Sequence, residues 1–152
     1  MLIKVQSPYV PIDIEIGNEI VHVYVNTTVD GLTNIANRCY EAAQKFDEKQ
    51  PIVDEATKAN DIDTILAIND EIATIAEGAI RSAIGDGYDR IMAALANTAP
   101  EFKPSDANHV MIQVMDAVLE IVKDAKAQML NNKAAHYLSE VNNAQAFAYS
   151  EN

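Results

Sequence analysis

The stretch that decides the fold is residues 11–25, PIDIEIGNEIVHVYV. Isoleucines alternate with acidic residues before the Gly-Asn pair at 17–18, and β-branched residues dominate after it. Apolar residues at every second position are typical of a half-buried strand, and Gly-Asn suits a tight turn. The pattern predicts a β-hairpin, which needs helices over its isoleucine and valine face because a lone hairpin is marginal in water. Residues 2–5 are a candidate third, edge strand, ended by Pro8 and Pro11.

Beyond the hairpin the apolar residues recur every three or four positions, which is the spacing of helices that bury one face. We expect a first helix that ends before Pro51, and then a linker or short acidic turn over residues 51–59. A second helix is predicted to begin at Asn60 or Asp61 and to stop at the Gly-Asp-Gly segment 85–87, since glycine readily takes the left-handed conformation at a helix end. The predicted buried residues are Leu32, Ile35, Ala36, Cys39, Ala43 and Phe46 in the first helix, and Ile62, Ile65, Leu66, Ile72, Ile75, Ala76, Ala79 and Ile80 in the second.

A short third helix is predicted from Tyr88 to about Ala96, followed by a loop over residues 97–104. The last helix should be capped by Ser105 or Asp106, because a short polar side chain there can accept from the first free N–H groups. Its predicted buried residues are Val110, Met111, Val114, Val118, Ile121, Val122, Ala125 and Met129.

The predicted fold class is therefore α+β, mainly α. An N-terminal hairpin of two or three strands packs on a bundle of about four helices. One domain is expected over residues 1–130, with the hairpin region at 1–26 and the helices at 27–130. Residues 131–152 turn polar and alanine-rich, and we expect a frayed helix or a mobile tail there.

Charge and cysteine content limit the function classes. The 152 residues include 23 acidic and 11 basic side chains, which gives a formal net charge of −12. Such a chain repels nucleic-acid phosphates, and its basic residues are scattered. Cys39 is the only cysteine, which excludes an intrachain disulfide and a cysteine-based zinc site. No apolar run approaches the roughly 18 residues of a membrane span. We expect a soluble, cytoplasmic protein that binds neither nucleic acid nor membrane.

Residue patterns for catalysis are weak. The histidines, His22, His109 and His136, lack the i, i+4 spacing that places two imidazoles on one helical face. Nucleophile and phosphate-binding motifs of the GxSxG, GxxxxGK and GxGxxG types do not occur. We therefore expect no enzyme, and no catalytic, cofactor-binding or metal-binding residue. The alternative is a small enzyme or a loose divalent-cation site, although a solvated helical face explains the acidic residues. Its candidate ligands are Asp54, Glu55, Asp61, Asp63, Asp70 and Glu71.

Methionines accompany the other apolar residues of the last two helices. Methionine most often fills a core, but its flexible thioether also suits an adaptable groove for a partner's helix. One small hairpin cannot cover three broad helical stripes, so these must pack on each other, on a second subunit or on a client. A homo-oligomer is a further expectation, formed through the hairpin edge or through the helices. The candidate protein-binding residues are Met92, Leu95, Phe102, Met111 and Met115.

The order of these parts resembles a known family. The hairpin over residues 12–25 leads into helices, the segment GDGYDRIM at 85–92 follows the second helix, and an amphipathic helix over residues 107–128 comes last. In these features the chain is similar to the small tail assembly chaperones of long-tailed phages and prophages of Gram-positive bacteria. Two departures stand out: Met92 lies where that family favours phenylalanine, and residues 51–61 look like a longer linker than usual.

The resemblance implies a non-catalytic binding function. Proteins of that family coat the long, apolar, helical tape-measure protein before the tail tube polymerises around it, and they are absent from the finished particle. A tape-measure-like partner, no cofactor and a location in the host bacterial cytoplasm follow as expectations. The alternative is another phage morphogenesis or structural protein, or a generic helical protein-binding adaptor.

Overall fold

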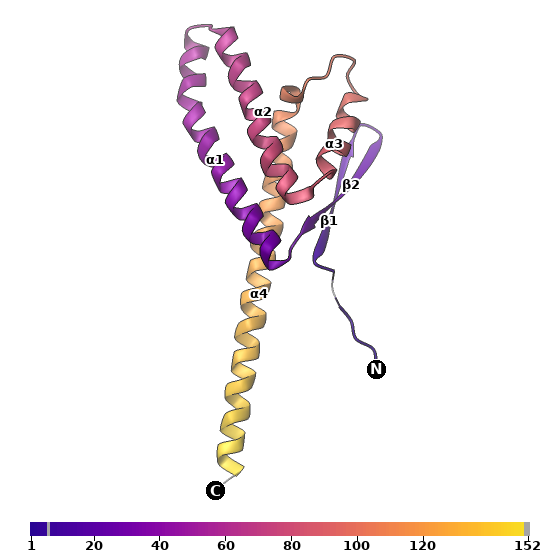
Figure 1. The fold of residues 1–152 in the computed structure, drawn as a ribbon, viewed down its shortest axis with the longest axis vertical. Coiled ribbons are helices and arrows are strands. Elements are labelled where there is room, and N and C mark those ends of the chain that lie inside the picture. Colours follow the sequence, from indigo (N-terminus) through magenta and orange to yellow (C-terminus); the bar gives the residue numbers. More distant parts are fainter. Residues whose placement is uncertain (6, 151–152) are drawn as a thin grey trace.

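The computed structural model describes residues 1–5 and 7–150, and the side chains at 133–137 and 139–150 lie outside that description. The elements in chain order are β1 (Tyr9–Ile16), β2 (Glu19–Asn26), α1 (Val29–Lys58), α2 (Ile62–Ile84), α3 (Gly87–Ala96), the short 3-10 helix η1 (Pro104–Ala107) and α4 (Asn108–Ser150). Helices α1 and α2 form a hairpin that packs on α4, and the two strands lie beside α3 (Figure 1). The predicted class, mainly helical with an N-terminal β-hairpin, is confirmed.

The two strands pair antiparallel over their whole length, from the turn to Tyr9 opposite Asn26. Gly17 has a φ of +60° in that turn, which is the left-handed conformation that tight hairpin turns favour. The alternation seen in the sequence places most of the β-branched residues on one side, against the helices, whereas Ile20 is exposed on the other. The buried residues of that face are Ile16, Val21, Val23 and Val25.

The candidate third strand does not form. Residues 2–5 have no strand partner; they are exposed, and they lead away from the sheet (Figure 1). Pro11 ends no strand either, because it lies inside β1 opposite Tyr24. Its missing N–H is tolerated there because β1 is an edge strand. We refer to residues 1–5 below as the N-terminal arm.

Helix α1 is longer than predicted. It continues through Pro51, so the linker expected over residues 51–59 is wrong. A proline inside a helix removes one hydrogen bond and crowds the preceding turn, at a cost of about 3 kcal/mol. Other contacts hold the helix across this point: Gln50 Nε2 donates to Asp54 Oδ1 at 2.9 Å, and Ala56 in the last turns is buried.

The boundaries of α2 follow the predicted signals. The Asp61 carboxylate accepts from the Thr64 backbone N–H at 3.2 Å and from its hydroxyl at 2.6 Å, which caps the first turn. At the other end Gly85 has a φ of +58° and stops the helix. Helix α3 then begins at Gly87, whose backbone is buried against β2.

The core lies where the buried hairpin face meets all four helices. Helix α4 contributes its buried residues as far as Val122, and it then remains helical to Ser150, where we expected a frayed helix or a tail. The last two residues of that prediction, 151–152, lie outside the described residues. The largest fully buried side chains are Leu32, Ile35, Ile80, Ile91, Val23, Val25, Val118 and Cys39.

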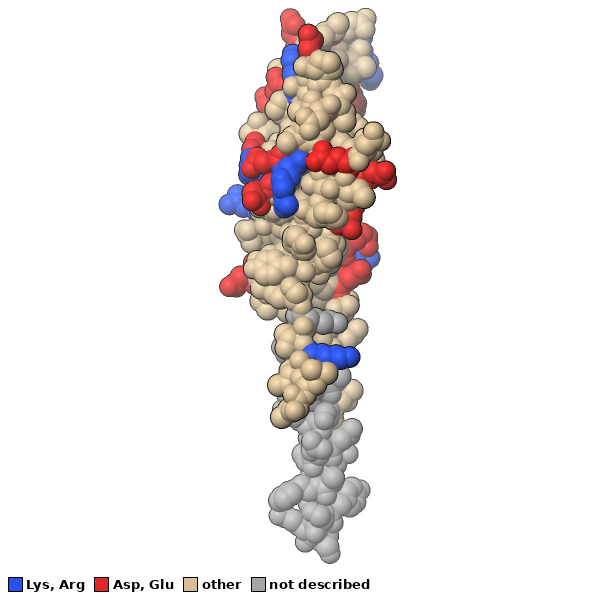
Figure 2. All heavy atoms as spheres, turned by 90° about the vertical axis from the view of Figure 1, so that its right-hand side faces the viewer, with Lys and Arg blue, Asp and Glu red and all other residues tan. Residues whose placement is uncertain are grey.

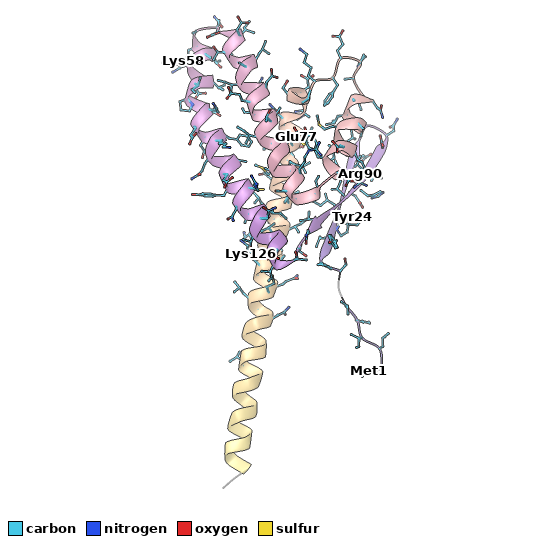
Figure 3. All side chains as sticks on the ribbon, viewed as in Figure 1. Met1, Tyr24, Lys58, Glu77, Arg90 and Lys126 are labelled. Atoms are coloured by element: carbon cyan, nitrogen blue, oxygen red, sulfur yellow. The ribbon has the colours of Figure 1, made fainter. Side chains whose placement is uncertain are left out.

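The molecule is elongated. Its accessible surface is 10709 Å², whereas a compact protein of 16.6 kDa exposes about 7,600 Å². Two parts leave the body of the fold. One is the N-terminal arm, and the other is the part of α4 that follows Lys126, a residue at the same height as the start of α1 (Figure 3). The protein therefore exposes more surface than a compact protein of the same mass.

Candidate protein-binding surface

The structure separates the five residues that the sequence pattern proposed. Met111 and Met115 are 2% and 6% exposed and belong to the core. They offer no surface to a partner, so we do not retain them in a candidate surface. Met92, Leu95 and Phe102 are partly buried against the same core, on α3 and the loop before η1. Their role in binding stays a prediction.

Exposed apolar side chains lie instead on the distal α4 segment, which we define as residues 126–150. Its side chains at 126–132 are all exposed, which covers about two full turns of helix. Leu130 is 68% exposed and Leu138 is 62% exposed. No other described element packs on these turns, and the helix leaves the body of the fold as a single rod (Figure 1).

The exposed turns of this helix lack tertiary packing. Most helical stability in proteins comes from packing of an apolar face, and residues 126–132 have no such packing on a described element. Leu130 and Leu138 are eight residues apart, a spacing that keeps two side chains on the same side of a helix. The distal α4 segment can therefore gain stability by packing on an apolar helix of another chain.

Sequence reasoning missed Leu130 because it searched along the buried stripe of α4. That stripe runs through Val118 and Val122 to Met129, which is 40% exposed where the core ends. Leu130 lies about 100° around the helix from Met129. A leucine outside the buried stripe, in a helix longer than the helices that it packs on, is the sequence feature that indicates such a residue.

A second exposed apolar group lies at the opposite end of the molecule. Ile62 and Leu66 in the first turns of α2 are 65% and 56% exposed, and Ile52 on α1 is 45% exposed. The α1–α2 turn lies at the far end of the molecule from the C-terminal end of α4 (Figure 1). These residues belong to a packed helical hairpin, so they provide a matched comparison for the distal α4 segment.

Charged side chains join α2 to α3. On the face shown in Figure 2, more of the charged surface is acidic than basic. Arg81 donates to Asp89 through both terminal nitrogens, at 3.0 and 2.6 Å, and through Nε to Glu77 at 2.9 Å. Its guanidinium also lies 4.6 Å from the centre of the Tyr88 ring. The hydrogen bond from Arg81 lowers the pKa of Asp89. This network gives Tyr88 and Asp89 of the GDGYD segment a structural role.

Two hollows of the described surface lie between packed elements. One of about 190 Å³ lies between α1 and α2, lined in part by Arg38, Lys45 and Gly78. Another of about 300 Å³ lies between β1 and α4. Within the described residues, no three His, Cys, Asp or Glu side chains are grouped to hold a metal ion. No helix in this part of the chain is long and apolar enough to cross a membrane.

Cys39 lies in the core on α1 and is 1% exposed. Burial raises the pKa of its thiol to about 11, so the reactive thiolate is scarce at neutral pH. The position agrees with its place in the predicted apolar stripe.

Neither a known protein family nor a characterised protein or solved structure gives a significant match to this chain.

Proposed function

We propose that this protein is a non-catalytic tail assembly chaperone, which covers an apolar helical segment of a tape-measure-like protein before the tail tube polymerises. The observation that supports the proposal is the distal α4 segment. It presents Leu130 and Leu138 to solvent, beyond the part of α4 that packs on the other described helices.

The chemistry of such a client matches this surface. A long apolar helix in the cytosol exposes a stripe of side chains that would otherwise drive aggregation. An amphipathic helix can bury that stripe by helix-to-helix packing, in which anchors spaced three, four, seven or eight residues apart line up. The distal α4 segment would thereby hide its own leucines and those of the client together.

Charge supports the same role. The chain has a net charge of −12, and a high net charge keeps a complex with an apolar partner in solution. Acidic side chains are spread over the body of the fold, as the face in Figure 2 illustrates. As part of this proposal, the protein acts in the host bacterial cytoplasm and is left out of the mature virion.

The proposal is tested by co-expression of the full chain with a tape-measure-like protein, followed by recovery through a tag on that client. The unchanged chain should be recovered with the client. The double substitution Leu130→Gln and Leu138→Gln should lower recovery about tenfold or more, because anchors of an interface dominate its affinity. Glutamine keeps a high helix propensity, so the far-UV circular dichroism should not change.

The matched control is the double substitution Ile62→Gln and Leu66→Gln, which removes two side chains of similar exposure at the other end of the molecule. It should leave recovery unchanged. Equal loss in both variants would remove the distal α4 segment from the site. A client that fails to recover the unchanged chain would overturn the function itself, and detection of the protein in purified particles would favour a virion component instead.

A further inference from the structure

The sheet has an open edge. Its order is β1–β2, so among the described elements β1 has a partner on one side only. A groove of about 300 Å³ runs along part of the open side, lined by β1 residues 12–15 and by α4. The α4 side is mostly apolar, with Val110, Val114 and Ala117. An open strand edge beside apolar side chains is a place where a further strand can add.

The direction of the backbone groups follows from the pairing. The Thr27 N–H donates to the Pro8 carbonyl at 2.6 Å, so the backbone N–H and carbonyl groups of the even-numbered β1 residues point toward β2. Because hydrogen-bonded and non-bonded pairs alternate in an antiparallel ladder, the backbone groups of the odd-numbered residues point away from β2, to the open edge. The backbone N–H and carbonyl groups of Asp13 and Glu15 therefore point along the groove, ready to pair with another strand.

The N-terminal arm is a segment of the right kind to occupy this groove. Leu2, Ile3 and Val5 are 84%, 73% and 84% exposed, which is unfavourable for an apolar segment in water. Side chains alternate in an extended chain, so Ile3 and Val5 face one way while Lys4 faces the other. The arm thus has one apolar side, and a second side on which Lys4 lies next to Leu2.

The two sides of the groove match the two sides of the arm. The apolar side chains of α4 lie below the β1 edge, next to the half-buried Ile12 and Ile14. Asp13 and Glu15 are exposed on the opposite face of β1. A strand placed there with Ile3 and Val5 toward α4 would bring Lys4 beside these two carboxylates. Opposite charges on neighbouring strands stabilise the pairing.

The arm of the same chain reaches this groove poorly. Three residues, 6–8, separate Val5 from the start of β1, so a direct fold-back would place Val5 opposite Tyr9 and Leu2 opposite Ile12. It would cover the half of the edge with no available donor, because the Tyr9 N–H donates to Ser7 Oγ at 3.2 Å and Pro11 has no N–H. The donors that face outward lie farther on, at residues 13 and 15.

We infer that the N-terminal arm of one copy adds as a strand to the open β1 edge of a second copy, so that the protein forms a dimer by exchange of arms. Reciprocal exchange satisfies both edges and buries both arms, as expected for a closed, two-fold symmetric pair. This surface is separate from the distal α4 segment. The inference therefore does not depend on the client proposed above.

The first test measures the mass of the full chain in solution by sedimentation and by light scattering at high micromolar concentration. We expect a species of about twice 16.6 kDa. The double substitution Ile3→Gln and Val5→Gln should return the protein to a monomer. Both side chains are exposed in the monomer, so the thermal unfolding of the monomeric variant should be that of a folded protein. The control, Ile62→Gln with Leu66→Gln, should remain a dimer.

A charge exchange tests the partner of the arm. Lys4→Glu alone and Glu15→Lys alone should each weaken dimerisation about tenfold, since each pair occurs twice in a symmetric dimer. The two substitutions in one chain should restore dimerisation in part, because the introduced glutamate then faces the introduced lysine but still lies beside Asp13. Hydrogen exchange should show slow amides at Asp13 and Glu15 in the dimer and fast ones in the arm variant.

Three results would overturn the inference. The first is a protein that stays monomeric at high concentration. The second is a dimer that survives the arm substitutions, which would place the contact elsewhere, for example on the distal α4 segment. The third is a combined charge variant that remains as weak as the single ones.

Discussion

The backbone of Gly87 lies against Val23 so closely that a Cβ on residue 87 would come within 2.8 Å of Val23 Cγ1. Val23 is fully buried, so its side chain has little room to give way. This approach joins the start of α3 to β2. The second glycine of the Gly-Asp-Gly segment is therefore explained by packing, whereas the first, Gly85, is explained by its positive φ.

Gly87→Ala should destabilise the protein by roughly 1–3 kcal/mol, the usual cost of forcing an extra methyl group into a packed core. Gly78→Ala is the matched control, because a Cβ at that position of α2 would meet nothing within 4 Å. It should stabilise the protein by about 0.5–1 kcal/mol, since alanine favours a helix interior over glycine. Urea denaturation measures both. A Gly87→Ala protein as stable as the unchanged one would contradict the close approach.

Proline in the middle of α1 gives a second prediction. Pro51 is exposed, so its replacement by alanine removes no core contact. The new N–H can donate within the helix, and the free energy of unfolding should rise by roughly 2 kcal/mol. Gln44→Ala, an exposed substitution in the same helix, should change stability far less. A Pro51→Ala protein that is less stable would indicate that the proline sets a bend which packing requires.

Pro51 also shows why a helix end cannot be predicted from proline alone. Proline is a reliable breaker in an isolated helix, and the linker over 51–59 was predicted on that ground. The rule omits tertiary packing, which offsets the local cost when the helix still packs beyond the proline, as it does through Ala56. The same limit explains the stripe of α1, in which Ala42 and not Ala43 is buried. Neighbouring positions differ by only 100° around a helix, and the choice depends on where the partner helix lies.

The hairpin and the helix ends were predictable because their signals are local. Alternation defined the strands, Asp61 capped α2, and the glycines at 17 and 85 adopt positive φ. The candidate surface was less predictable, because Met111 and an exposed residue such as Leu130 are both apolar in sequence. Only the paths of the other helices show that the first is enclosed and the second is not.

Cys39 supplies a probe of the core. Its thiol is buried and its pKa is raised to about 11, so on the order of one thiol in a thousand is ionised at about pH 8. A thiol reagent should label the native protein slowly and the urea-unfolded protein at once. In the Cys39→Ala background, Tyr40→Cys places a cysteine at the next position, where the native side chain is 66% exposed. That variant should label rapidly when folded. Fast native labelling at Cys39 would show that the core opens.

Acid stability should depend on Asp89. Hydrogen bonding to Arg81 lowers the pKa of this carboxyl below its ordinary value of 3.8. A group whose pKa is lower in the folded state adds stability above the unfolded pKa, and this stability is lost as pH falls through the folded pKa. Asp89→Asn should therefore be less stable than the unchanged protein at neutral pH, with the difference vanishing in strong acid.

Asp61 is a control for Asp89, because the hydrogen bonds that it accepts from Thr64 also lower its pKa. Asp61→Asn retains an N-cap acceptor, so it isolates the effect of charge at the start of α2 from the loss of the cap. Denaturation curves between about pH 7 and about pH 2, with and without about 1 M salt, distinguish the two sites. The Arg81–Asp89 pair is exposed, so salt should reduce its contribution. A gap between Asp89→Asn and the unchanged protein that persists in strong acid would show that Asp89 acts through packing and not through its charge.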